Sequence, residues 1–594
     1  MASGFEIERS IGGRAWRARA CDEAAVLAIS QRLGLPEIIG RILAGRGLTP
    51  ETAPAFLAPR VREALPDPSH LLDLEVAVER LCEAVLAGET VGLLGDYDVD
   101  GATSVALLGR YLREVGAKAA IDVPDRLAEG YGPNPAAFGR LAAAGCRLVV
   151  TLDSGTTAFA ALEGARERGI EVIVVDHHAA EPELPPAFAV VNPNRVDQTS
   201  PLGDLAAVGV TFLLAVGLNR CLRERGHFAQ RPEPDLRRWL DLVALGTVCD
   251  VVPLSGLNRA FVAQGLRVAA RGGNPGLVAL AGVAKLKGPP DAEHLGFWLG
   301  PRINAGGRVG RSMLGAALLA SDLPDEMAGI ALELDRLNGE RRALERRVLG
   351  EAEAALAAGG ADPRPLLVCA GEGWSPGVVG LVASRLVERH HRPAVVIGLA
   401  DGIGKGSGRS VAGFDLGAAV IAARREGLLL QGGGHAMAAG LTVMAERLDA
   451  LGAFLAERLR RELGPEPAPA PALRFDGSLR VAAILAGLGA TIARLAPFGR
   501  GNPEPRFVVP HARVWQARRV GESHVDCRLA DPAGGRVRAI AFRAADTPLG
   551  AALLEAKGAP LHLAGRIRLD RWQGETRVCL QIDDAAPASV APVS

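Results

Sequence analysis

Acidic residues follow three short apolar runs in the first half of the chain. The pairs of run and acid are 91–94 with Asp96, 148–152 with Asp153, and 172–175 with Asp176. Short buried runs of this kind are typical of parallel strands, whose carboxyl ends meet at one edge of a sheet. Carboxylates gathered at that edge repel one another unless their pKa values rise or a cation binds. The spacing therefore predicts a metal site.

The first acid opens a denser cluster, Asp96-Tyr97-Asp98-Val99-Asp100-Gly101. If the strand continues through it, alternate residues share a face and the three aspartates point one way. Gly101 would then let the chain turn into a helix. A solvated turn and a calcium loop are the alternatives for this pattern. A calcium loop would end in a bidentate glutamate, but Leu107 and Leu108 stand there.

Two histidines and a further acid complete the candidate ligands. His177 and His178 follow Asp176 directly, and carboxylate with imidazole suits Mn²⁺ or another transition metal. Asp250 stands among apolar residues, and a lone buried aspartate needs an ion partner or a metal. A structural and a functional role for Asp250 are equally compatible with that. Together these side chains could hold two cations, which clamp an in-line phosphoryl displacement.

The elements that would position these residues alternate between strands and helices. Helical spacing at 103–115 and 158–168 separates the apolar runs, which predicts a parallel α/β sheet. A long helix is expected over 324–358, ended by Gly359-Gly360. A second α/β segment follows, with strands near 366–369 and 394–397.

The last part of the chain predicts a small β-barrel. Residues 465–471 alternate proline with alanine and glutamate, as linkers do. Short strand-like runs follow, and turns separate them. These runs are 507–509, 537–542 and 577–582, and residues 585–594 are expected to fray.

We therefore expect an α/β protein of several parts, which a length of 594 residues favours. The expected parts are a helical segment at 1–85 packed on the next domain, a parallel-sheet domain with the candidate metal site at 86–323, the connecting helix at 324–358, a second α/β domain at 359–464, and a barrel of the OB type at 472–585.

Whole-chain charge gives no support to nucleic-acid binding, because the formal net charge is +0. Residues 471–594, however, hold 17 Arg and Lys against 11 Asp and Glu. Four aromatic residues lie among them: Phe507, Trp515, Phe542 and Trp572. A basic groove with aromatic platforms is how OB-folds bind single strands, although more than half of these rings are expected to be core.

Cysteine usage and hydropathy indicate in which cellular compartment the protein works. The 8 cysteines form no C-x-x-C pair, which argues against a zinc ribbon and favours reduced core thiols of the cytosol. No apolar run approaches the ~20 residues that span a bilayer. The first 19 residues carry scattered charges and no apolar block, so no signal peptide is expected. We expect a cytoplasmic protein that does not associate with a membrane.

Four motifs in this order resemble those of the DHH phosphoesterase superfamily: D-Y-D-V-D-G, T-L-D-S-G, D-H-H and G-T-V-C-D-V-V-P-L. With everything downstream, the chain from about residue 10 to 585 resembles the RecJ-type exonucleases of that superfamily. The resemblance implies a metal-dependent exonuclease that degrades single-stranded DNA from 5′ to 3′. It would use two Mn²⁺ or Mg²⁺ ions and release 5′-mononucleotides in DNA repair and recombination.

The resemblance also implies roles for single residues. Asp98 and Asp100 would bind one metal each, and Asp153 would bridge the two. His177 and Asp250 would complete the second site. Asp96 would support the first site and act in catalysis with Asp153, and His178 would face the scissile phosphate. Two positions depart from the family pattern: Ser154 stands where Cys is more frequent, and Ser375 where His is common.

Glycine-rich motifs further along would hold the substrate. Residues 301–308, 406–410 and 432–436 combine glycines with basic or hydroxyl side chains, so that backbone could approach phosphate closely. Each alone would usually be an ordinary turn. In order they resemble the 5′-phosphate pocket of the family, which implies seven substrate-binding residues: Arg126, Arg302, Asn304, Arg308, Ser407, Arg409 and His435. An anchored 5′-phosphate would set the polarity.

Other functions remain open. A DHH phosphodiesterase for oligoribonucleotides or cyclic dinucleotides is typically shorter and lacks the barrel. A non-catalytic DNA-binding scaffold would have lost metal ligands, and here every expected ligand is present. A pyrophosphatase would have another C-terminal domain. The resemblance implies single-stranded DNA with a 5′ end as partner, together with single-strand binding protein and a RecQ-like helicase, and it favours a monomer.

Overall fold

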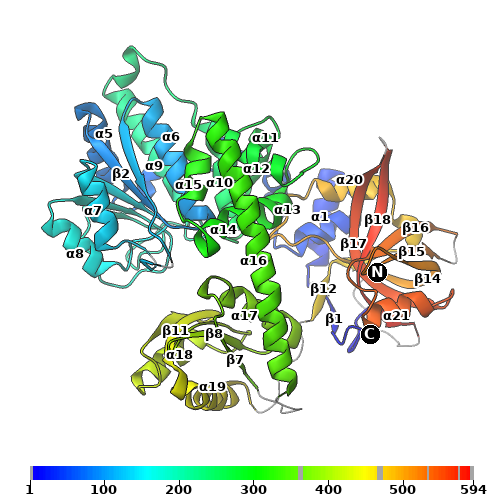
Figure 1. Ribbon diagram of the computed structural model, residues 1–594. Coiled ribbons are helices and arrows are strands. Elements are labelled where there is room, and N and C mark those ends of the chain that lie inside the picture. The colour runs from blue at the N-terminus through cyan, green and yellow to red at the C-terminus, as the bar shows by residue number, and fades with distance from the viewer. Residues whose placement is uncertain are drawn as a thin grey trace. The chain divides into compact units, whose positions relative to one another are not determined.

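The computed structural model describes residues 5–126, 128–130, 132–358, 365–464, 472–531, 534–572 and 575–588 (Figure 1). The expected linker at 465–471 and the expected helix end at Gly359-Gly360 lie outside these residues. The chain forms two compact units. Unit 1 combines Met1–Arg60, Pro253–Arg259 and Ala470–Ser594, and unit 2 combines Val61–Val252 and Ala260–Pro469.

The first sheet of unit 2 is fully parallel, with the order β3-β2-β4-β5-β6. The strands are β2 (Thr90–Gly95), β3 (Lys118–Asp122), β4 (Leu148–Leu152), β5 (Glu171–Val175) and β6 (Ala189–Val191). The predicted parallel sheet is thus confirmed, and the three apolar runs are β2, β4 and β5. Strands β3 and β4 lie on opposite sides of β2, so the strand order reverses at β2. Open α/β sheets bind their ligands at such a point.

Helices pack on this sheet, and further helices pack on those in turn. They are α4 (Val61–Ala64), α5 (Leu74–Ala87), α6 (Val99–Glu114), α7 (Pro135–Ala143), α8 (Phe159–Glu167), α9 (Ala207–Glu224), α10 (Leu240–Cys249), α11 (Gly256–Ala269), α12 (Pro275–Val283), α13 (Ala292–His294), α14 (Gly300–Val309) and α15 (Leu314–Ala320). Helix α6 is buried from Val99 to Leu112 and packs on α9, α10 and α15. The turn that starts α6 is therefore held rigidly.

Helix α16 (Pro324–Ala358) occupies the stretch for which a long helix is expected. Its side chains Val348 and Ala352 enter one core with α17 (Pro376–His390), and Trp374 Nε1 donates to Glu351 of α16 at 2.6 Å. Within the described residues, no helix is long and apolar enough to cross a membrane.

A second sheet lies beyond α16, with the order β10-β11-β9-β8-β7. Its strands are β7 (Leu367–Glu372), β8 (Ala394–Ala400), β9 (Ile403–Arg409), β10 (Gln431–His435) and β11 (Ala438–Met444). Helices α16 and α17 cover one face of this sheet, and α18 (Leu416–Arg425) and α19 (Leu448–Leu463) cover the other. The glycine-rich segments 406–410 and 432–436, expected as turns or loops, lie largely in β9 and β10.

Unit 1 contains the predicted barrel. The strands of its sheet are β13 (Gly477–Ser478), β14 (Phe507–Val520), β15 (His524–Ala530), β16 (Arg536–Ala541), β17 (Pro560–Trp572) and β18 (Glu575–Pro587). The short strand β12 (Leu473–Phe475) precedes them, and the helices are α20 (Ala486–Ala493) and α21 (Pro548–Glu555). The sheet closes because β14 also pairs with β17. Strand β18 reaches Pro587, so the expected fraying is wrong for residues 585–587; residues 589–594 lie outside the described chain.

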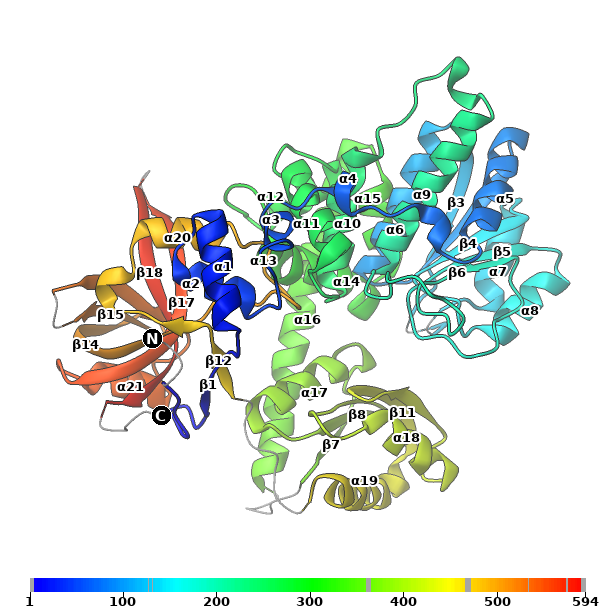
Figure 2. The same ribbon diagram turned by 180° about the vertical axis from the view of Figure 1, so that it is seen from behind.

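The N-terminal segment is part of unit 1, as Figure 2 shows for α1 (Glu23–Leu33) and α2 (Glu37–Ala44). Strand β1 (Trp16–Ala18) pairs in parallel with β12, and Trp16 Nε1 donates to Asp584 Oδ2 at 3.0 Å. Ile29, Ile39 and Ala53, the last from α3 (Ala53–Leu57), join the core of the barrel. Residues 5–60 thus belong to unit 1, where Phe56 contacts Arg259, a residue of the expected domain 86–323. Helix α5 packs against α9 of that domain. The expected domain bounds stay a prediction.

Candidate active site

Hydrogen bonds of the sheet extend to the three acids that follow the strands. The Asp96 N–H donates to the Leu152 carbonyl at 3.2 Å, and the Asp153 N–H donates to that of Val175 at 3.0 Å. The Asp176 N–H continues the series to Val191 at 3.1 Å. The acids therefore meet at one edge of the sheet, as their positions after the strands predict.

The D-Y-D-V-D-G segment is a turn and the start of a helix, and the expected extended strand is wrong here. Asp98 caps the N-terminus of α6, because its Oδ1 accepts from the N–H groups of Asp100 and Gly101 at 3.0 and 3.1 Å. The aspartates consequently point to two places: Asp96 and Asp98 lie near Asp153, and Asp100 lies near Asp250. Gly101 permits close approach, since a Cβ there would lie 2.5 Å from the Asp96 carbonyl oxygen.

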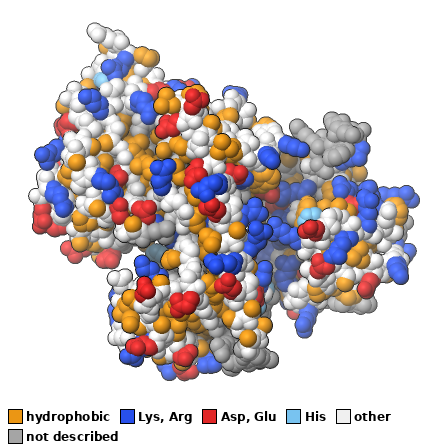
Figure 3. All heavy atoms as spheres, viewed as in Figure 1, with side chains coloured by type: hydrophobic (Ala, Val, Ile, Leu, Met, Phe, Trp, Pro, Cys, Tyr) orange, Lys and Arg blue, Asp and Glu red, His pale blue; other side chains and the backbone are white. Residues whose placement is uncertain are grey.

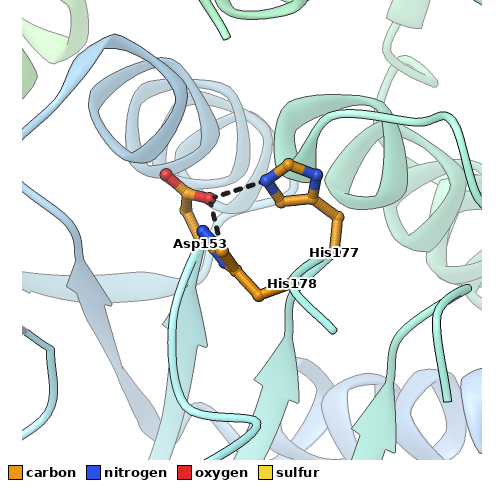
Figure 4. A group of neighbouring side chains, drawn as sticks. All are labelled: Asp153, His177 and His178. Carbon is orange, nitrogen blue, oxygen red and sulfur yellow. Dashed lines mark ion pairs between the residues drawn. The ribbon is translucent and has the colours of Figure 1, made fainter. Parts of the chain in front are cut away.

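Asp153 and the two histidines form the centre of the site (Figure 4). The Asp153 Oδ1 lies 3.4 Å from His177 Nε2 and 3.9 Å from His178 Nδ1. Asp153 is buried and has a φ of 64°, a strained conformation for a residue other than glycine. Such strain is characteristic of functional positions.

His177 joins this centre to the second group of acids. Its Nε2 lies 3.6 Å from Asp250 Oδ2 and 3.9 Å from Asp100 Oδ2. Asp250 caps the C-terminus of α10. The Asp100 carboxylate accepts from the first two N–H groups of α9, those of Ala207 at 2.6 Å and Val208 at 2.9 Å. Each Asp100 oxygen keeps a second lone pair that can face a cation.

The donor set fits divalent cations. Three groups of side chains each bring their ligand atoms within 4.8 Å of one another: Asp96 with Asp98 and Asp153; Asp153 with His177 and His178; Asp100 with His177 and Asp250. Asp153 Oδ1 and His177 Nε2 are buried, and within the described chain neither has a hydrogen-bond partner. Buried polar atoms are rarely left this way, and a cation would satisfy them.

The charges of the cluster are unbalanced without a cation. Burial, together with the neighbouring carboxylates, raises the pKa of Asp153 and of Asp96 well above the usual value. Burial and the charge of Asp250 raise the pKa of Asp100 to about 7. The cluster therefore holds protons that a divalent cation would displace.

Asp176 lies outside the ligand groups and holds the histidines instead. Its Oδ1 accepts from the His177 N–H at 2.7 Å and lies 2.7 Å from His178 Nδ1. Burial lowers the pKa of His178, but the Asp176 carboxylate outweighs it and raises the value to about 9. Burial would raise the pKa of Asp176, yet the His178 hydrogen bond and charge hold it below its usual range. The Asp176 carboxylate thus favours the charged form of His178.

Two asparagines that sequence reasoning missed also fix the histidine pair. Asn192 Nδ2 donates to the His178 carbonyl at 2.9 Å, and Asn194 Nδ2 donates to the His177 carbonyl at 2.5 Å. Asn192 follows β6 directly, and Asn194 stands two residues later. The same signal that drew attention to the acids, a polar residue at the end of an apolar run, could have identified them.

Three of the predicted phosphate-binding arginines form a cluster beside the acids. Burial, and then the charge of Arg126, lowers the pKa of Arg308 to about 10 and also lowers that of Arg409. The charge of Arg126 also acts on Asp96. In the described part of the chain, none of the three arginines pairs with an acid. A concentration of guanidinium groups without ion-pair partners is a site for an anion.

The other predicted substrate-binding residues differ in their placement. Ser407 lies with Arg409, because a Cβ on Gly380 would lie 3.3 Å from Ser407 Oγ and 3.2 Å from Arg409 Nη2. Asn304 Oδ1 is buried without a hydrogen-bond partner among the described residues. His435 is exposed at the end of β10.

Arg302 is not brought to the arginine cluster. Its Nε donates to Asp335 at 2.8 Å and its Nη1 to the Trp298 carbonyl at 2.6 Å. The glycine-rich stretch around it, expected as a turn, is helix α14. Sequence reasoning missed Arg341 of α16, whose charge also acts on Arg308, because nothing in a long polar helix marks one arginine among many.

The two departures from the family pattern occupy structural positions. Ser154 is buried beside Asp153. Ser375 caps the N-terminus of α17, where its Oγ accepts from the Gly377 N–H at 3.3 Å. The serine that replaces the common histidine thus helps to start a helix.

The aromatic residues of the barrel divide between core and surface. Phe507 is buried, whereas Trp515 and Phe542 are about half exposed, at 51% and 52%. The guanidinium carbon of Arg536 lies 5.8 Å from the centre of the Trp515 ring. Figure 3 shows basic side chains gathered on the visible face of the barrel. The Trp572 side chain lies outside the described residues.

Comparison with known proteins identifies the family. Residues 90–247 match the DHH family, N-terminal domain; residues 364–461 match the DHHA1 domain; and residues 475–584 match the RecJ OB domain. The single-stranded-DNA-specific exonuclease RecJ of Escherichia coli is 37% identical over 96% of this chain and 99% of its own length. This chain belongs to the RecJ family. RecJ of Bacillus subtilis is 33% identical over 96% of this chain and 70% of its own length.

Solved RecJ structures have the same fold as this chain. RecJ of Thermus thermophilus in complex with Mn²⁺ has a TM-score of 0.80 and 30% identity, over 96% of this chain and 79% of its own. A RecJ exonuclease bound to manganese has a TM-score of 0.56 and 35% identity, over 67% of this chain and 96% of its own. The α/β fold with a C-terminal OB barrel is therefore confirmed.

Proposed function

We propose that this chain, like its RecJ relatives, is an exonuclease specific for single-stranded DNA. It hydrolyses phosphodiester bonds from 5′ to 3′ with divalent cations and releases 5′-mononucleotides. The observation that carries the proposal is the buried group of Asp153, His177 and neighbouring acids beside an arginine cluster without acidic partners among the described residues. An acidic metal site next to an anion site suits a strand whose terminal phosphate and first phosphodiester bond lie side by side.

Two ions, Mn²⁺ or Mg²⁺, would occupy the acidic cluster. Asp98 and Asp100 would each hold one ion, Asp153 would serve both, His177 and Asp250 would complete the second site, and Asp96 would support the first. Bound ions would supply Lewis-acid activation of water and of the phosphoryl oxygens. The relatives crystallised with Mn²⁺ and Mg²⁺ support this choice of metal.

The histidine pair would act on the scissile phosphate. His178, kept charged by Asp176, would donate a hydrogen bond to a phosphate oxygen, where negative charge develops in the transition state. Asn192 and Asn194 would keep both rings in place through the histidine carbonyls.

The arginine cluster would anchor the 5′-terminal phosphate. Arg126, Arg308 and Arg409, with Ser407, present guanidinium and hydroxyl donors close to the acids. A terminal phosphate held there presents the first linkage to the metals, which accounts for polarity. Asn304 and His435 would contact the strand further along; for Arg302, bound to Asp335, the structure offers no such support.

The cellular setting is proposed from the family. The chain would act in the cytoplasm in DNA repair and recombination, as a monomer, with single-strand binding protein and a RecQ-like helicase. The partly exposed Trp515 and Phe542 of the basic barrel would stack on bases of the single strand.

A nuclease assay tests the proposal. The substrates are a 5′-phosphorylated single strand with a 3′ label and the matching duplex, with Mn²⁺ present. We expect shortening of the single strand alone, and a loss on the order of 100-fold or more in Asp153→Asn. Asp401→Asn is a matched control, because Asp401 is exposed and also has a positive φ, of 50°. Intact DNA binding without cleavage by the wild-type protein, in Mn²⁺ or Mg²⁺, would identify a scaffold instead.

A further inference from the structure

The ring of Tyr97 lies where the metal-binding turn meets the arginine cluster. The guanidinium carbon of Arg126 lies 4.6 Å from the ring centre, a cation–π contact. Gly307 approaches the same side chain so closely that a Cβ there would lie 2.7 Å from Tyr97 Cδ2 and 2.9 Å from its Cβ. Three segments far apart in the sequence thus meet on one ring.

Few other contacts orient Arg126. Its backbone N–H donates to Ser312 Oγ at 3.3 Å, but within the described chain its guanidinium has neither an acid partner nor a hydrogen bond. Among the described residues, the Tyr97 ring is the direct contact recorded for this guanidinium, besides the longer-range attraction of Asp96. A phenol ring carries no acid group that would compete with a phosphate for Arg126.

The backbone of Tyr97 is tied to the other end of the site. It stands between Asp96 and Asp98, and Asp98 caps α6, which is buried over most of its length. The ring also abuts Gly307, the neighbour of Arg308. One residue consequently connects the candidate metal ligands with two of the candidate phosphate anchors.

We propose that Tyr97 is a positioning residue that sets the distance between the 5′-terminal phosphate and the scissile phosphate. This inference rests on the proposed function. By holding Arg126 at a fixed place relative to Asp96 and Asp98, the ring selects a strand that carries a 5′-phosphate and presents its first linkage. Without the ring, Arg126 loses its orientation, and both the preference for a 5′-phosphate and the one-nucleotide register weaken.

The test compares Tyr97→Leu with Tyr97→Phe, which keeps the aromatic face. We measure kcat/KM on 5′-phosphorylated and 5′-hydroxyl strands, and the lengths of the first products. Tyr97→Leu should lower the phosphate-to-hydroxyl ratio by roughly tenfold, mainly through KM, and release some products longer than one nucleotide. Tyr97→Phe should keep the wild-type ratio. Gly307→Ala, which pushes on the ring, should lower the ratio as well.

Mn²⁺ affinity distinguishes positioning from damage. If Tyr97→Leu binds Mn²⁺ as the wild type does and loses only the ratio, the proposal is supported. An unchanged ratio, or an equal loss on both strands together with weaker Mn²⁺ binding, overturns it. The ratio of Kd values for the two strands, measured by anisotropy in EDTA, tests the same preference without cleavage. A wild type that cuts no DNA would refute the proposed function, whereas one that cuts both strands equally would refute only this inference.

Discussion

At the scale of single residues, the site depends on buried acids that repel one another. Asp96, Asp100 and Asp153 are almost fully buried, and each has a raised pKa. Their positions after strands could be predicted from the sequence. Which of these acids would bind metal could not be predicted. Asp176, at an equivalent position, holds His177 and His178 instead, because its carboxylate accepts from the N–H groups of these two residues.

The raised pKa values predict how metal binding stabilises the fold. Asp100 has a pKa of about 7 when folded and an ordinary value of 3.8. Between these two values the folded protein without metal holds an extra proton on Asp100. The contribution of Asp100 to stability is therefore fully present below the ordinary pKa and is lost as the pH rises toward 7. A cation replaces that proton. We expect Mn²⁺ to raise Tm more at pH 8 than at pH 5, and a hundredfold excess over Kd to contribute ~2.7 kcal/mol.

Differential scanning calorimetry of the wild type and Asp153→Asn checks this pH dependence. The variant removes one carboxylate, so without metal it should be more stable than the wild type at pH 8, yet gain little from Mn²⁺. Asp401→Asn should behave like the wild type under all conditions. A Tm gain from Mn²⁺ that is equal at both pH values, or larger at pH 5, would contradict the electrostatic account.

At the scale of elements, the junction of α14 with α17 positions the arginine cluster. Arg308 Nη1 donates to the Gly377 carbonyl at 3.2 Å, and a Cβ on Gly377 would lie 2.2 Å from the Arg308 carbonyl oxygen. Only glycine permits this approach at the start of α17. The second sheet, which carries Ser407 and Arg409, is thereby docked onto the helix that carries Arg308.

Gly377→Ala should separate the two elements. We expect weaker binding of 5′-phosphorylated strands and a free energy of unfolding lower by about 1–3 kcal/mol, as for other overpacked sites. Gly329→Ala is the matched control: Gly329 lies in α16 with open space around its Cα, so alanine should be neutral or stabilise by up to ~1 kcal/mol. Equal stability and DNA affinity of the two variants would show that the junction is not close packed.

The glycine-rich segments show where sequence reasoning reaches its limit. Glycine marks turns, so the sequence predicts turns there, but α14, β9 and β10 occupy most of these segments. Here glycine serves close packing: a Cβ on Gly408 would lie 2.6 Å from Leu416, and one on Gly306 would lie 3.1 Å from the Arg311 carbonyl. The sequence shows that a glycine is needed without showing which neighbour requires it.

At the scale of the whole molecule, the sheet, the long helix and the barrel could be predicted because their patterns are local. The partner of the N-terminal segment could not. Trp16 contacts Asp584, which lies 568 residues away, and Ile29 and Ile39 share a core with Phe507. The buried faces of α1 and α2 indicate that each helix packs on something, but not on what.

The central claim is that the acidic cluster binds two divalent ions and that these ions make the chain a 5′-end exonuclease. The most direct test measures bound Mn²⁺ per chain by atomic emission, and 5′-mononucleotide release from single-stranded DNA, on the same dialysed samples. We expect two ions per chain at saturation, activity that rises with occupancy, and loss of both in Asp153→Asn. Full activity in metal-free samples, or a saturated protein that releases no 5′-mononucleotides, would contradict the account.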